Sequence, residues 1–301
     1  MSNENYTKIR AEYAVWLQTL GFSEKVVYNY PNHLHDFFEW LQSKQIHHIT
    51  AITQKHIEHY FEYLQTRPNK RRKGLLLSAS TLNDYYTAVD KLLEFLHQMG
   101  MNQAPTPTNF RMTIDNRERV NNIQPFTQAE IKELQSHINE LYPNLPFTLR
   151  ETKQEQLKLI FALYYGCGLR RSEGYGLTLD NIDFERKTVF VKQGKNYKDR
   201  IVPMNTGVYK ALEHYIYNFR HLQKLPHKRL FIHTTGKLNN SLQDLQAVCS
   251  TESIKNKRLT LHILRHSIAT HLMQNGMSIE QIGRFLGHSS LDSTQIYTHL
   301  I

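Results

Sequence analysis

The sequence predicts a mainly α-helical protein with two domains, of which the second carries a small β-hairpin. Three observations lead to this fold class. Apolar residues recur at helical spacing through the N-terminal third, a polar stretch with several prolines follows, and further on two β-branched runs flank a Gly-Lys-Asn turn. The chain has 301 residues, of which 40% are hydrophobic, so it can bury a substantial core.

Four amphipathic helices are expected to form a small bundle at the N-terminus. The first ends at Gly21, and the second begins behind the cap Ser23, with Pro31 expected to kink or delay it. Thr53 and Ser80 open the third and fourth helices. One face of the first helix carries Ile9, Tyr13, Trp16, Leu17 and Leu20.

A linker is expected to separate the bundle from the second domain. Residues 104–125 are polar, contain prolines and lack periodicity. The sequence therefore predicts an N-terminal helical domain of residues 1–103 and a C-terminal domain of residues 126–301.

The second domain is expected to begin with two helices and a hairpin. Thr127 with Glu130, and Thr152 with Glu155, have capping-box spacing, so each pair is expected to open a helix. The stretch "KTVFVKQGKNYKDRIVPM" predicts the β-hairpin. Further helices are expected near residues 207–223, 241–249, 262–275 and 279–286.

The charge balance favours a polyanionic partner. Lys and Arg number 37 against 27 Asp and Glu, which gives a net charge of +10. Nucleic acid is favoured over acidic lipid, because no long basic amphipathic helix stands out. The loop "RPNKRRKG" is either a solvated charged loop or, in so basic a protein, a loop that contacts phosphates. Its candidate DNA-binding residues are Lys70, Arg71, Arg72 and Lys73.

Neither a disulfide framework nor a membrane segment is predicted. Cys167 and Cys249 are far apart in the sequence and have apolar neighbours, which fits a reducing compartment. The N-terminus lacks an apolar signal core, and the longest apolar run is too short to span a bilayer. A soluble, cytoplasmic protein is expected.

The pair His262 and Arg265 is suited to binding an anion, because side chains three apart on a helix are neighbours. His262 and His266 also have zinc-ligand spacing. Arg265 would repel a cation and no central glutamate is present, so no metal is expected there and His266 is interpreted as a structural histidine. We likewise interpret the carboxylates in "LDNID" as a capped turn before a strand.

Five landmarks follow one another along the second domain: "GLRRSE", "QGKNYKDRIVP", "HILRH", "LGHSS" and a final tyrosine. In this order and spacing they resemble the catalytic domain of the tyrosine recombinases, the phage-integrase and Xer-like family. The resemblance implies an N-terminal core-binding helical domain and a C-terminal catalytic α+β domain. It implies six catalytic residues, which are Arg170, Lys195, His262, Arg265, His288 and Tyr297.

Glu173 matches the family's acidic position that supports the first arginine. Gly174 and Gly176, where relatives usually carry bulky aliphatic residues, are expected to loosen the helix beside Arg170. Lys192 and Lys198 are alternatives to Lys195 as the hairpin lysine.

The resemblance implies a site-specific DNA recombinase or integrase that cuts and rejoins strands through a 3′-phosphotyrosine. Two arginines suit the charge of the transition state, a lysine can protonate the leaving 5′ oxygen, and histidines can deprotonate the tyrosine. Neither ATP nor a metal or other cofactor is expected, since the chain has no Walker-type loop and no paired-carboxylate metal site.

The expected partner is double-stranded DNA at a specific site, with self-association into a tetramer on two sites, in the cytoplasm at the nucleoid. Two alternatives remain. One is a type IB topoisomerase-like enzyme that nicks and reseals a duplex. The other is a non-catalytic DNA-binding regulator with the same fold.

Overall fold

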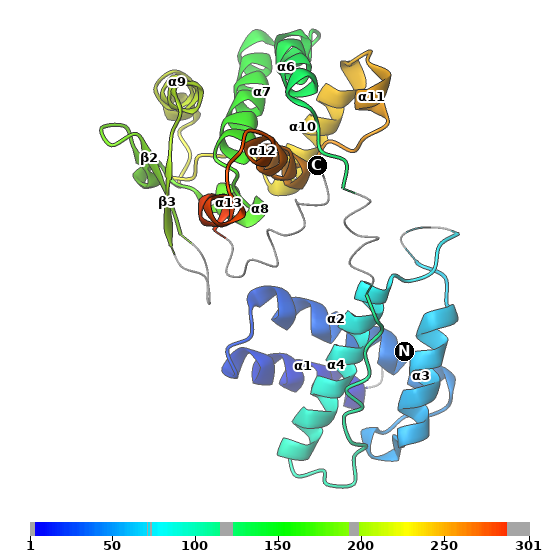
Figure 1. Cartoon of the computed structure of the whole chain (residues 1–301). Coiled ribbons are helices and arrows are strands. Elements are labelled where there is room, and N and C mark those ends of the chain that lie inside the picture. Colours follow the sequence, from blue (N-terminus) through cyan, green and yellow to red (C-terminus); the bar gives the residue numbers. More distant parts are fainter. Residues whose placement is uncertain (1–3, 71, 73, 115–122, 193–198, 288–301) are drawn as a thin grey trace. The chain divides into compact units, whose positions relative to one another are not determined.

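The computed structural model describes residues 4–70, 72, 74–114, 123–192 and 199–287 (Figure 1). The chain divides into two compact units, Met1–Asp115 and Asn116–Ile301. The division falls inside the segment expected to be a linker. None of the described helices is both long and apolar enough to cross a membrane.

The four predicted helices of the N-terminal unit are confirmed. They are α1 (Glu4–Thr19), α2 (Glu24–Ser43), α3 (Gln54–Thr66) and α4 (Ala79–Gln98). Gly21, with φ of +75°, follows the end of α1, and the Ser23 side chain caps α2 by accepting a hydrogen bond from the Val26 amide. Pro31 is buried inside α2, which continues past it.

Two details of this unit differ from the prediction. Ser78 rather than Ser80 caps α4: its hydroxyl accepts a hydrogen bond from the Thr81 amide at 3.3 Å, so Ser80 already lies in the first turn. Leu20, expected on the buried face of the first helix, is 54% exposed because α1 ends at Thr19.

The first part of the expected linker packs on the N-terminal unit. The Asp90 carboxylate is buried and accepts hydrogen bonds from the Thr108 amide at 2.8 Å and the Asn109 amide at 3.1 Å. Arg111 adds an ion pair with Asp90 at 2.8 Å. These contacts tie the chain after α4 to the bundle.

The C-terminal unit combines helices with a small antiparallel sheet. Its strands are β1 (Ile182–Asp183), β2 (Thr188–Val191) and β3 (Arg200–Pro203), in the order β1-β2-β3, so the predicted hairpin is confirmed and gains a third strand. Its α-helices are α6 (Gln128–Ser136), α7 (Phe147–Ile160), α8 (Arg171–Gly176), α9 (Thr206–Tyr215), α10 (Thr235–Val248), α11 (Glu252–Lys255), α12 (Leu261–Gln274) and α13 (Ile279–Leu286).

One predicted capping box is confirmed and one is wrong. Thr127 and Glu130 cap α6 reciprocally. Thr152 instead lies inside α7, where its hydroxyl donates to the Thr148 carbonyl. That helix begins after Pro146, a residue that supplies no amide donor and so suits a helix start.

Candidate functional site

One buried carboxylate, that of Glu173, joins three arginines from different parts of the C-terminal unit. The Arg170 Nη1 donates to Glu173 Oε1 at 2.7 Å. Arg200, on β3, donates to both carboxylate oxygens at 2.9 and 3.0 Å. Arg265, on α12, lies 3.7 Å from Glu173 Oε2. We call Arg170, Arg200, Arg265 and Glu173 the arginine cluster.

The same three arginines hold the end of α13. Arg200 Nε donates to the Phe285 carbonyl at 3.2 Å, Arg265 Nη2 to the Leu286 carbonyl at 2.8 Å, and Arg170 Nη2 to the Gly287 carbonyl at 2.6 Å. Carbonyls at the end of a helix lack partners within the helix and carry partial negative charge, so cations are favoured there. The cluster therefore fixes the backbone up to the residue before His288.

Two glycines allow the close packing that brings these elements together. Gly168 has φ of +59°, and a Cβ there would lie 2.8 Å from Leu286 Cδ2. Its carbonyl accepts a hydrogen bond from Arg265 Nη1 at 2.6 Å. Gly174 lies against the Tyr164 ring, which a Cβ would meet at 2.6 Å. The expectation that glycine at this position loosens α8 is therefore wrong for Gly174: it lets the helix pack closely.

Charge compensation makes the cluster stable in spite of its burial. Burial alone would raise the pKa of Glu173, but the hydrogen bonds and charges of Arg200 and Arg170 outweigh it and lower that pKa. The Arg265 side chain is 5% exposed, whereas that of Arg170 is 27% exposed. Arg170 is thus the more open guanidinium for an anionic ligand.

Two histidines lie near the cluster on α12 and differ in setting. His262 lies in the first turn of α12 and is partly exposed to solvent. Partial burial, and then the charges of Arg265 and Arg171, lower the pKa of its imidazole. The ring is therefore neutral near pH 7 and can accept a proton. Burial, together with His262 and Arg265, lowers the pKa of His266 to about 4. A His266 that is neutral near pH 7 fits the structural role expected for it.

The other predicted catalytic residues are not placed. Lys195, His288 and Tyr297 lie outside the described residues, as does Lys198. Lys192 is described and exposed, directly after β2. The described structure thus brings together Arg170, Glu173 and Arg265, with His262 beside them.

The basic loop of the N-terminal unit is described only in part. Arg71 and Lys73 lie outside the described residues. Lys70 forms ion pairs with Asp36 at 3.1 Å and with Glu39 at 3.9 Å. Arg72 is exposed. A bridge between Pro68 and Leu76 closes the base of the loop.

Arg200 is the member of the cluster that sequence reasoning missed. It pairs with Val191 across the hairpin and precedes the buried Val202 by two residues, so strand alternation places both on the inward face. An arginine on an inward face requires a carboxylate partner. The alternation of residues along this strand is visible in the sequence, but it does not identify Glu173 as the carboxylate that pairs with Arg200.

Arginines and a neutral histidine gathered in a basic protein define a site suited to phosphoryl chemistry. Comparison with known proteins identifies the group: the chain belongs to the phage integrase family, whose model matches residues 125–301, and the phage integrase N-terminal SAM-like domain matches residues 13–100. The family consists of tyrosine recombinases, which are DNA strand-exchange enzymes, so the predicted family, fold class and enzyme class are confirmed.

Curated relatives match along most of their length. The tyrosine recombinase XerC of Halalkalibacterium halodurans is 27% identical over 92% of this chain and 88% of the relative. XerD of Bifidobacterium longum is 27% identical over 93% and 88%. Among solved structures, the XerH recombinase bound to palindromic difH substrate has a TM-score of 0.70 at 16% identity, covering 99% of this chain and 93% of that one. The Tn1549 transposon integrase with circular intermediate DNA has a TM-score of 0.66 at 19% identity, covering 96% and 94%.

Proposed function

We propose that this chain, a site-specific DNA recombinase by family, cuts DNA by attack of Tyr297 on a backbone phosphate. The attack forms a 3′-phosphotyrosine and releases the 5′ oxygen as a hydroxyl. The phosphoester bond is conserved, so a hydroxyl from another strand can reverse the step without ATP. The observation that supports this most strongly is the arginine cluster, which orients two family-motif arginines through one buried carboxylate.

Arg170 and Arg265 would bind the non-bridging oxygens of the scissile phosphate. An arginine stays charged and offers a planar pair of donors, which suits the extra negative charge of a pentavalent transition state. Glu173 and Arg200 would act as positioning residues, because they contact the arginines rather than the phosphate.

Proton transfers complete the proposed reaction. His262, neutral near pH 7, is suited to accept the phenolic proton of Tyr297, a role it would share with His288. Lys195, in the hairpin turn, would protonate the departing 5′ oxygen, with Lys192 or Lys198 as alternatives. No metal takes part in this scheme.

The proposed DNA partner is a duplex with a specific recombination site, acted on at the nucleoid by four protomers on two sites. The net charge of +10 and the loop of residues 70–73 support contacts with phosphates. The XerH structure, which is a post-cleavage complex with difH DNA, is consistent with the same kind of substrate.

The experiment begins by recovering the DNA bound to the protein in cells and sequencing it. A plasmid with two copies of the recovered site is then incubated with purified protein. Recombined products that depend on both copies support the proposal. Relaxation of any supercoiled plasmid without recombination would favour the topoisomerase-like alternative, and binding without strand cleavage would favour the regulator.

A further inference from the structure

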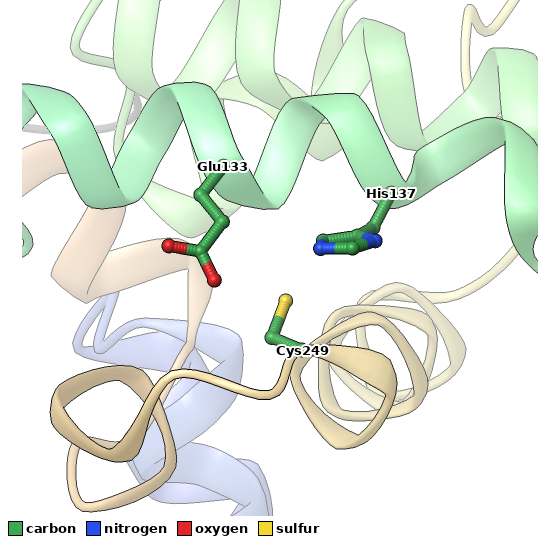
Figure 2. A group of neighbouring side chains, drawn as sticks. All are labelled: Glu133, His137 and Cys249. Carbon is green, nitrogen blue, oxygen red and sulfur yellow. The ribbon is translucent and has the colours of Figure 1, made fainter.

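A second group of chemically reactive side chains lies in the C-terminal unit, on elements that contribute nothing to the arginine cluster. Glu133 comes from α6, His137 from the 3-10 turn that continues it, and Cys249 from the residue after α10. One potential ligand atom from each side chain lies within 4.8 Å of the others. Figure 2 shows all three pointing into the space between α6 and the end of α10.

The backbone holds these side chains on facing surfaces. Glu133 and His137 are four residues apart, which places them side by side on one helical face. Cys249, the residue after α10, lies opposite them and is 1% exposed. Its thiol makes a long hydrogen bond, 3.5 Å, to the Leu245 carbonyl.

Neighbouring groups orient two of the three side chains. The His137 Nδ1 lies 2.7 Å from Glu140 Oε2, so its Nε2 is the ring nitrogen presented to a ligand. The Thr251 hydroxyl donates to Glu133 Oε1 at 2.5 Å, which holds the Glu133 carboxylate in place. A carboxylate on the far nitrogen of a histidine is the usual support of a metal-binding imidazole, because it fixes the ring and strengthens its donor.

The Glu133 carboxylate brings a negative charge to this group. Among the described residues, Glu133 takes part in no ion pair. A divalent cation would stabilise the thiolate and the carboxylate together.

We propose that Cys249 Sγ, His137 Nε2 and a Glu133 carboxylate oxygen bind one Zn²⁺ ion. Sulfur, imidazole and carboxylate together suit zinc, and water can complete a tetrahedral site. The thiol proton passes to solvent on binding.

The bound zinc would stabilise the fold, because its ligands join α6 and the turn that follows it to the residue after α10. Lys257 already bonds Glu130 at 2.6 Å, and the Ser253 hydroxyl donates to Glu130 at 2.7 Å, so α6 is joined to the segment that leads into α12. Zinc would add a further link along the same boundary.

The test uses the full chain without a histidine tag, stripped with a chelator and then dialysed against Zn²⁺. Elemental analysis should find about one zinc per chain, and the unfolding temperature should rise on zinc addition. Co²⁺ in place of zinc should give a sulfur-to-metal charge-transfer band.

Cys249→Ser should abolish that band, and His137→Gln should lower zinc uptake by at least tenfold. Cys167→Ser is the matched control, because Cys167 is also buried in this unit but belongs to no such group among the residues that the structure describes. Circular dichroism would establish that each variant is folded. The proposal is overturned if the wild-type protein takes up no zinc, or if folded His137→Gln binds as much zinc as the wild type. DNA cleavage does not enter this test.

Discussion

Arg200 provides the sharpest test of the arginine cluster. It donates two hydrogen bonds to Glu173 and one to the Phe285 carbonyl, and its side chain is 10% exposed. Arg200→Met keeps the length of the side chain and removes the charge. Breaking a buried ion pair costs about 3–5 kcal/mol. Because Glu173 retains Arg170 and Arg265, we expect a loss of about 2 kcal/mol in the free energy of unfolding.

For a unit of this size, such a loss lowers the unfolding temperature by about 4–8 °C. We also expect the rate of covalent adduct formation on a nicked DNA substrate to fall roughly 10- to 100-fold, because Arg170 and Arg265 lose their shared orientation. Scanning calorimetry and a denaturing gel measure the two effects.

Arg186→Met is the matched control. Arg186 follows β1, is 85% exposed and lies 3.8 Å from Asp183, so its loss should change stability by less than about 0.5 kcal/mol and leave adduct formation unchanged. Equal unfolding temperatures and equal adduct rates for the Arg200 and Arg186 variants would refute the positioning role of Arg200.

Three further predictions concern pH, packing and salt. The charge of Arg171 helps to lower the pKa of His262, so Arg171→Gln should raise that pKa. The fall in DNA cleavage rate at low pH should then occur at higher pH, because the protonated ring cannot act as a base. An unchanged dependence of the cleavage rate on pH would exclude His262 as the base. Gly174→Ala places a Cβ 2.6 Å from the Tyr164 side chain and should destabilise the protein by about 1–3 kcal/mol. Gly176→Ala is the control and should not destabilise it, because no packing neighbour lies within 4 Å of the added Cβ. Equal denaturation midpoints for the two variants would contradict this packing. DNA affinity should fall steeply with salt, and a flat dependence in a binding titration would contradict phosphate contacts.

Local signals were predictable from the sequence, because they involve residues three or four apart. The caps Ser23 and Thr127 and the pair His262–Arg265 are of this kind. The prediction failed where two local signals competed. Ser78 and Ser80 are two residues apart at the start of the same helix, and only Ser78 caps it. Thr152 has cap spacing inside a helix that Pro146 had already opened.

Contacts between distant segments were not predictable in the same way. The sequence indicated that Glu173 supports Arg170, but only the folded structure shows Arg200 and the end of α13 on the same cluster. Similarly, helical spacing puts Glu133 beside His137, while nothing local brings Cys249 to them. Gly174 suggested a loose helix because the sequence does not show the Tyr164 ring against it.

The most direct test of the central proposal is the identity of the residue that becomes linked to DNA. The protein is incubated with a nicked substrate carrying its recovered site, the adduct is digested, and mass spectrometry locates the modified residue. We predict a nucleotide phosphate on Tyr297, and for Tyr297→Phe undiminished DNA binding with no adduct. A normal yield of adduct from the Tyr297→Phe variant, or modification at another residue, would contradict the mechanism.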